Sequence, residues 1–341
     1  MKPILVTMGD AAGIGPETIV KAWLQGELHD AVVIGDPAVL RRAAGSAPFV
    51  LDAMTAVIEH PADRLLVPPG CLPVLPPPDL PNHMPGGLAA LPMGVVDGRN
   101  GAAATRCIEH AVRLVLAGAG AAIVTAPIHK AALAAAGVPF PGHTEMLQAL
   151  AAEAAPGMPA PTVRMMLANE ELRVVLVTIH SALRKAIDAV TFDAVLQTLC
   201  IAHRAAAAWQ ATPPRIAVAG LNPHAGEGGL FGDEEIRIIG PAIQAAVAQG
   251  IHATGPYAPD TVFMRARRGE FDLVVAMTHD HGLIPVKYLG VEQGVNVTLG
   301  LPFVRTSPDH GTAYDIAGQG LADPSSLVAA LRMARRLVAA A

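Results

Sequence analysis

Three histidines in this chain follow short apolar segments that are typical of buried strands. They are His180 after Leu172–Thr178, His224 in the glycine-rich loop after Ile216–Ala219, and His279 after Leu273–Met277. Imidazole is a common ligand of zinc and other first-row divalent ions, and ligands of open α/β sheets bind at the carboxyl ends of strands. The pattern therefore indicates a divalent-metal site that the fold must assemble, because no zinc-finger spacing is present. Unrelated hydrogen bonds in loops or in the core are the alternative for each histidine.

Charged side chains within an apolar region form a second candidate group. Lys287, Asn296 and Arg305 punctuate the otherwise apolar stretch Leu283–Val304. A buried lysine or arginine needs an anionic partner, because an unpaired charge in an apolar environment is costly. That partner is either a substrate phosphate or carboxylate, or an internal Asp or Glu.

Two glycine-containing turns could also contact a ligand. The first, GHTE at 142–145, places His143 beside Thr144, and both can hydrogen-bond a polar substrate; alternatively, Thr144 or its neighbour caps a helix over Glu145–Ala154. The second, GDAAGIGPE at 9–17, is a strand-to-helix turn of the kind that binds anions. It lacks the GxGxxG order, so we expect a tight turn packed near the site rather than a dinucleotide fingerprint.

Strand-like and helix-like segments alternate along the chain, which predicts the α/β class. Further expected strands are Ile4–Thr7, Ala31–Ile34, Ala121–Thr125 and Val163–Leu167. The main expected helices are Glu17–Leu24, Pro37–Ala44, Thr105–Leu116, Ala131–Ala136, Thr191–Ala208, Glu234–Gln249 and Ser325–Ala341. Residues 66–85 are proline-rich and predict an extended excursion. Because no linker is visible, two interleaved lobes are expected.

Composition argues against several classes of partner. The 341 residues have a net charge of −5 and no basic block, so nucleic acid is not expected as the main partner. The longest uncharged apolar stretch, residues 114–128, is too short for a membrane span, and no signal-peptide pattern opens the chain. Three scattered cysteines predict reduced thiols in the cytoplasm. A charged fraction of only 16% suggests that a partner subunit covers part of the surface.

With these segments in view, the chain resembles the PdxA family of 4-hydroxythreonine-4-phosphate dehydrogenases over essentially its whole length. The resemblance is carried by GDAAGIGPE at 9–17, TAPIHK at 125–130, GHTE at 142–145, GLNPHAGEGG at 220–229, GPYAPDT at 255–261, HDHGLIPVKYLG at 279–290 and GVNVTLGLPFVRTSPDHGTA at 294–313. A single one of these motifs would mean little, but the full set in this order is highly specific.

The resemblance implies the isocitrate/isopropylmalate dehydrogenase-like fold, an α/β fold of two lobes with a cleft between them. The first lobe would contain residues 1–135 together with 285–341, and the second would contain residues 136–284. The resemblance also implies an obligate homodimer whose site is completed across the interface, in a cytoplasmic enzyme with no membrane partner.

Roles for individual residues follow from the same resemblance. One divalent ion (Zn, Mg or Co) would be held by His180, His224 and His279. The phosphorylated hydroxy acid would be contacted by His143, Thr144, Lys287, Asn296 and Arg305, with Lys287 and Asp260 as the candidate catalytic residues. NAD or NADP would bind along the cleft, within Gly294–Gly311.

The implied reaction is NAD-dependent oxidation of 4-phosphooxy-L-threonine to a 3-oxo acid, which loses carbon dioxide to give 3-amino-2-oxopropyl phosphate in vitamin B6 biosynthesis. Thr278 and His281 stand where the family more often has Tyr and Gln. A paralogous dehydrogenase of D-threonate or D-erythronate 4-phosphate is therefore the alternative. A metal-dependent hydrolase or aldolase that works without NAD is a more distant one, as is a non-catalytic binding protein. His281 would share a face with His279 in an extended chain and would diverge from it after a turn.

Overall fold

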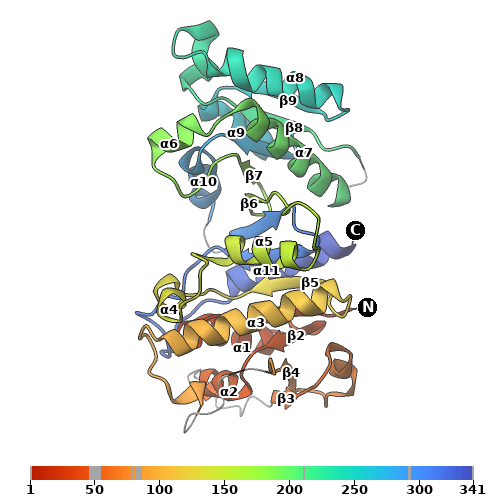
Figure 1. Cartoon of the computed structure of the whole chain (residues 1–341), viewed down its shortest axis with the longest axis vertical. Coiled ribbons are helices and arrows are strands. Elements are labelled where there is room, and N and C mark those ends of the chain that lie inside the picture. Colours follow the sequence, from red (N-terminus) through yellow and green to blue (C-terminus); the bar gives the residue numbers. More distant parts are fainter. Residues whose placement is uncertain are drawn as a thin grey trace. The chain divides into compact units, whose positions relative to one another are not determined.

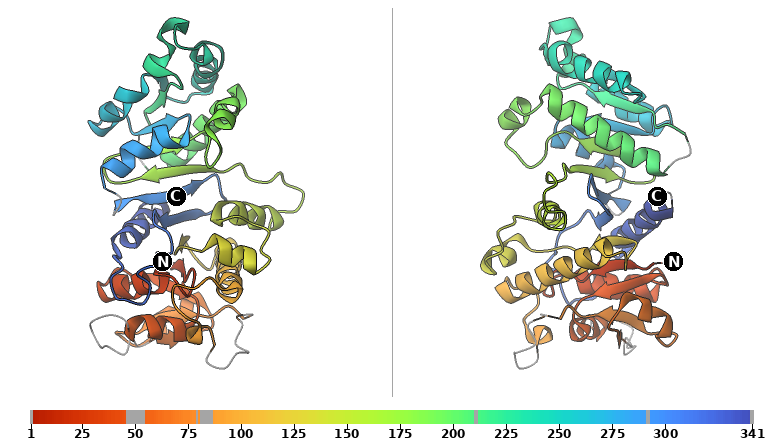
Figure 2. Two further views of the ribbon diagram at one scale, coloured as in Figure 1. Left: turned by 90° about the vertical axis from the view of Figure 1, so that its left-hand side faces the viewer. Right: turned by 45° about the vertical axis from the view of Figure 1, so that its right-hand side comes forward.

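The computed structural model describes residues 2–45, 55–78, 80, 87–209, 212–290 and 293–339. The chain forms two compact units (Figures 1 and 2). The first unit comprises residues 1–162 and 301–338, and the second comprises residues 163–300 together with the last three residues. Both units combine strands with helices, which confirms the α/β class.

The sheet of the first unit is parallel throughout its described strands. These are β1 (Ile4–Thr7), β2 (Ala31–Ile34), β3 (Thr55–Val57), β4 (Leu72–Leu75), β5 (Ala122–Thr125) and β12 (Val304–Pro308), in the order β3-β4-β2-β1-β5-β12. Every residue of β1, β2 and β5 is buried, which agrees with their continuous apolar sequences. The carboxyl ends of β1, β5 and β12 therefore meet at one edge.

The helices of the first unit pack on this sheet and on one another. They are α1 (Gly15–Leu24), α2 (Pro37–Gly45), α3 (Gly98–Leu116), α4 (Lys130–Ala135), α5 (His143–Glu153) and α11 (Ser325–Ala339), with short 3₁₀ turns at Pro61–Leu66 and Leu88–Ala90. The long helix α3 runs along the strands (Figure 1) and buries Ile108 against them. It starts at Gly98 instead of the expected Thr105, because Asp97 caps its first turn through the backbone N–H of Arg99 at 2.8 Å.

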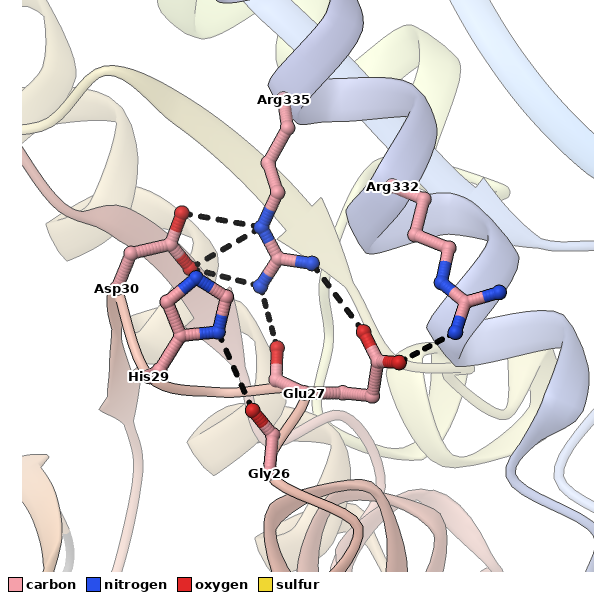
Figure 3. Close-up of polar contacts among 6 residues, drawn as sticks. All are labelled: Gly26, Glu27, His29, Asp30, Arg332 and Arg335. Atoms are coloured by element: carbon pink, nitrogen blue, oxygen red, sulfur yellow. Dashed lines mark hydrogen bonds and ion pairs between the residues drawn. The ribbon is translucent and has the colours of Figure 1, made fainter.

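The C-terminal helix is tied to the start of the chain by charged contacts (Figure 3). Arg335 Nη2 donates to Asp30 Oδ1 at 2.7 Å, and Arg332 Nη2 donates to Glu27 Oε1 at 2.5 Å. Burial, the largest single influence, would raise the pKa of Asp30, but the hydrogen bonds from Arg335 and the Arg335 charge act together against it, and the net effect lowers that pKa. The helix thus completes the first unit from the far end of the sequence.

The second unit has a mixed sheet. Its strands are β6 (Arg164–Ala168), β7 (Arg173–Leu176), β8 (Ile216–Ala219), β9 (Ala253–Tyr257), β10 (Leu273–Ala276) and β11 (Val295–Leu299), in the order β11-β6-β7-β10-β8-β9. The pairs β11/β6 and β6/β7 are antiparallel, whereas β7, β10, β8 and β9 are parallel neighbours. The three segments that precede the candidate histidines are therefore adjacent strands that point the same way.

The helices of the second unit are α6 (Leu183–Asp188), α7 (Phe192–Trp209), α8 (Gly240–Ala248), α9 (Pro259–Arg267) and α10 (His279–Tyr288). Helices α7 and α8 lie side by side (Figure 2). The expected helix Glu234–Gln249 is divided: a π-helical turn, Glu235–Ile239, precedes α8. A π-turn inside a helix often marks a functional site.

The boundaries between the units differ from those expected. They fall after residues 162 and 300, not after residues 135 and 284. Residues 136–162 join the first unit because Met146 and Leu147 of α5 are fully buried in its core. Residues 285–300 join the second unit because β11 pairs with β6, with Asn296 opposite Leu167.

Two other expectations concern extended segments and membranes. The proline-rich region contains β4, which pairs with β2 and β3, so this part of it belongs to the sheet; residues 79 and 81–86 lie outside the described residues. Among the described residues, no helix combines the length and apolar character that crossing a bilayer requires.

Candidate active site

Two of the three predicted metal ligands lie together at the carboxyl edge of the second sheet. The His180 and His279 rings have centroids 5.5 Å apart. Both line a hollow of about 260 Å³ that Thr178, Ser181 and Asp280 also line. Because β7 and β10 are parallel neighbours, the chain delivers both imidazoles to the same place. His180 adopts a left-handed backbone conformation (φ 46°), which is uncommon for a residue with a side chain.

His279 is oriented by the residue that follows it. Helix α10 begins at His279, and the His279 Nδ1 atom lies 2.7 Å from Asp280 Oδ1. A carboxylate bound to one imidazole nitrogen is a common way to fix the ring and leave the other nitrogen for a metal ion. The arrangement therefore suits a metal ligand that coordinates through Nε2.

His224 lies in an unusual left-handed turn. Residues His224, Ala225, Gly226, Glu227 and Gly228 all have φ between 44° and 79°. Each non-glycine residue in this conformation costs about 1–2 kcal/mol, so the turn must be stabilised by its surroundings. His224 lines a second hollow of about 260 Å³ with Asn222, Asp260 and His281.

The donor types fit a first-row divalent ion, because imidazole and carboxylate are the usual ligands. The positions of these side chains fit such an ion only in part. Among the residues that the structure describes in one chain, no group of three His, Cys, Asp or Glu side chains lies close enough together to hold a metal ion. The structure thus pairs His180 with His279 and leaves His224 in the neighbouring hollow.

His281 diverges from His279 because the chain has already turned into α10. In a helix, residues two apart point in different directions, whereas in a strand they share a face. His281 accordingly lines the hollow of His224 and Asp260. It also lines an adjoining apolar hollow of about 650 Å³, to which Phe263 and Ile284 contribute.

In the first unit, Arg305 is the centre of a buried polar group. Its side chain is 3% exposed, and its Nη2 donates to Thr125 Oγ1 at 2.6 Å. Burial lowers the pKa of the guanidinium to about 9, so it remains charged at neutral pH. A charged, fully buried guanidinium beside a hydroxyl is a natural anchor for a substrate anion.

His143 lies close enough to Arg305 to be affected by its charge. Burial, followed by the Arg305 charge, lowers the pKa of His143 well below its ordinary value, so the imidazole is neutral at pH 7. Its Nε2 atom is buried and has no hydrogen-bond partner among the residues that the structure describes. His143 starts α5, whose N-cap is Gly142 without a side-chain hydrogen bond, so the interpretation of Thr144 as a helix cap was wrong.

The remaining predicted contacts are more exposed. Lys287 lies on α10 and is exposed, so the expectation of a buried lysine was wrong. The reason is helical periodicity: Gly282, Leu283 and Val286 occupy the inner face of α10. Asn296 is half-buried in β11, opposite Leu167.

One polar cluster in the first unit was not predicted. The fully buried Asp10 accepts hydrogen bonds from the Ala12 backbone N–H at 2.8 Å and from the Tyr314 hydroxyl at 2.9 Å, while the His129 ring stacks on Tyr314 at 4.5 Å. Burial raises the pKa of Asp10, and it also raises that of Tyr314, which has the Asp10 carboxyl beside it. The sequence alone could not predict this cluster in full, because its residues come from three turns that are far apart in the chain.

Comparison with known proteins gives a consistent result. The profile of the family described as "Pyridoxal phosphate biosynthetic protein PdxA" matches residues 27–334. A 4-hydroxythreonine-4-phosphate dehydrogenase from Beijerinckia indica is 53% identical, covering 98% of this chain and 95% of its own. A D-threonate 4-phosphate dehydrogenase from Pectobacterium atrosepticum is 45% identical, with coverage of 98% and 99%.

Solved structures agree. The crystal structure of 4-hydroxythreonine-4-phosphate dehydrogenase from Klebsiella pneumoniae superimposes with a TM-score of 0.87 at 44% identity, and the match covers 99% of this chain and 98% of that one. Sequence profile, full-length relatives and fold coincide, and the chain belongs to the PdxA family.

Proposed function

We propose that this protein is a nicotinamide-dependent dehydrogenase that oxidises 4-phosphooxy-L-threonine to a 3-oxo acid, which then decarboxylates to 3-amino-2-oxopropyl phosphate. The observation that carries the proposal is the 53% identity, over nearly the whole chain, to a relative named for this activity. The buried Arg305, together with the neutral His143, supports it, because both suit the phosphate of such a substrate.

The proposed reaction has two steps, an oxidation and a decarboxylation. Oxidation breaks the C–H bond at the hydroxyl-bearing carbon; hydride reduces NAD⁺ to NADH, and the hydroxyl proton leaves to a base. The C1–C2 bond of the 3-oxo acid then breaks, carbon dioxide departs, and C2 takes a proton. A bound divalent ion would supply Lewis-acid polarisation of the hydroxyl and of the resulting carbonyl. Lys287 and Asp260 are the proposed proton carriers, and Asp260 lines the hollow of His224.

The proposed ligands of that ion are His180, His224 and His279. The adjacent His180 and His279 imidazoles support this assignment. Because His224 lies in the neighbouring hollow, we propose that a second copy of the chain completes the site in a homodimer. A monomer that keeps full activity in sedimentation at micromolar concentration would contradict this. For the cofactor, we propose NAD or NADP along Gly294–Gly311.

One observation favours D-threonate 4-phosphate as a second candidate substrate. A relative named D-threonate 4-phosphate dehydrogenase matches almost as much of the chain, at 45% identity. We therefore propose a direct test: NADH formation with 4-phosphooxy-L-threonine, D-threonate 4-phosphate and D-erythronate 4-phosphate, with NAD or NADP, with and without chelator. The leading proposal expects the highest kcat/KM for 4-phosphooxy-L-threonine and loss of activity with chelator. Turnover without a nicotinamide would refute the dehydrogenase assignment.

A further inference from the structure

We infer that Glu235 is a positioning residue that holds the His224 loop in its left-handed conformation and thereby determines the metal affinity of the protein. This inference rests on the proposed role of His224 as a metal ligand. The relevant segment is the loop Gly220–Gly229, which leaves β8 and turns back toward the π-helical turn that begins at Glu235.

The Glu235 carboxylate is only 4% exposed, and the start of the loop surrounds it. Its Oε1 atom accepts the backbone N–H groups of Leu221 at 2.7 Å and Asn222 at 2.8 Å. Its Oε2 atom accepts Asn222 Nδ2 at 2.9 Å. A buried carboxylate needs such donors, because without them its charge would be costly to bury. Three charge-assisted hydrogen bonds therefore fix the two residues before Pro223 and His224.

The fit of the loop around this carboxylate is close. A Cβ atom added to Gly226 would lie 2.8 Å from Glu235 Oε2, and one added to Gly220 would lie 3.0 Å from Oε1. The glycines at both ends of the turn therefore let the backbone approach the carboxylate from two sides. His224 lies between these glycines with φ 52°. The position of its imidazole therefore depends on the contacts between the loop and the Glu235 carboxylate.

The neighbouring Glu234 offers a matched control. It contacts the same loop through one side-chain hydrogen bond, from Asn222 Nδ2 at 2.6 Å, and no hydrogen bond links it to the backbone of Leu221 or Asn222 among the contacts of the described residues. Glu235→Gln removes the negative charge and replaces one acceptor oxygen with an NH₂ group that accepts no hydrogen bond, so at least one of the three hydrogen bonds is lost and the others lose their charge assistance. Glu234→Gln makes the same chemical change where only a side-chain contact is lost.

The experiment measures Co²⁺ affinity by chelator competition for the wild type, His224→Ala, Glu235→Gln and Glu234→Gln. Amide hydrogen exchange is followed in the metal-free proteins over residues 220–230. We expect Glu235→Gln to weaken Co²⁺ binding about 10–100-fold, the range for residues that orient metal ligands, and to accelerate exchange at Leu221 and Asn222. We expect Glu234→Gln to change the affinity less than about threefold.

The outcomes separate this inference from the proposed function. If His224→Ala weakens Co²⁺ binding but Glu235→Gln does not, or if both glutamate variants weaken it equally, the positioning role is refuted. If His224→Ala leaves Co²⁺ binding unchanged, the metal assignment fails, while the exchange data still decide whether Glu235 holds the loop. Should Glu235→Gln not fold, Glu235→Asp, which keeps the charge but shortens the reach, provides the same comparison.

Discussion

Replacing Arg305 with lysine tests the anion-binding role most directly. The guanidinium is 3% exposed and is held by Thr125 Oγ1 at 2.6 Å, so its orientation is fixed before the substrate arrives. A lysine keeps the positive charge but cannot reproduce the planar fork that binds two oxygens at once. The variant therefore loses at least one charge-assisted hydrogen bond to the substrate.

The magnitude follows from that loss. A hydrogen bond to a charged group contributes about 1.5–3 kcal/mol, which corresponds to a 10- to 150-fold increase in Kd. We expect this increase for 4-phosphooxy-L-threonine, measured by titration calorimetry without cofactor. The KM of the variant should rise by a similar factor, whereas the cofactor KM should change little.

Arg164 provides a matched control elsewhere in the chain. Its Nε donates to Thr198 Oγ1 at 2.7 Å, and burial lowers its pKa as it does for Arg305. Arg164→Lys should therefore cost comparable thermal stability but leave substrate Kd within about twofold. If Arg305→Lys also leaves the Kd within twofold while both variants unfold at similarly lowered temperatures, Arg305 has a structural role only and the reasoning fails.

Three further predictions address other parts of the molecule. His281→Gln should keep its metal content and shift substrate preference or the pH profile modestly, because a fourth protein ligand would fill the open position that catalysis needs; loss of the metal would make His281 a ligand. Tyr314→Phe should lower the free energy of unfolding by about 1–3 kcal/mol in urea titrations, because the buried Asp10 carboxyl loses a donor; an unchanged midpoint would contradict this. The lowered pKa of Asp30 stabilises the fold above its unfolded pKa of about 4, and this contribution is lost as pH falls through the lower folded value. Arg335→Met should therefore flatten the dependence of Tm on pH below about pH 4, and equal slopes would refute the pairing.

The sequence alone determined the α/β class, most of the buried strands and the family. Strands such as β1 and β8 were predictable because their continuous apolar runs reflect burial on both faces, which needs no distant information. The family followed from motifs that are local in sequence. His180 and His279 were expected to meet because each follows an apolar strand, and their rings are 5.5 Å apart.

Tertiary structure decided the features that depend on contacts between distant segments. The hydrogen bond between Asp10 and Tyr314 joins residues 304 positions apart. The hydrogen bonds of Glu235 with the His224 loop depend on a π-helical turn that the hydrophobic periodicity of the sequence did not reveal. Lys287 looked buried because its neighbours are apolar, yet the helix turns it outward. Local sequence specifies which elements form, because propensity and burial pattern act over a few residues. Which side chains meet is decided by packing of the whole chain, which a single sequence records only indirectly.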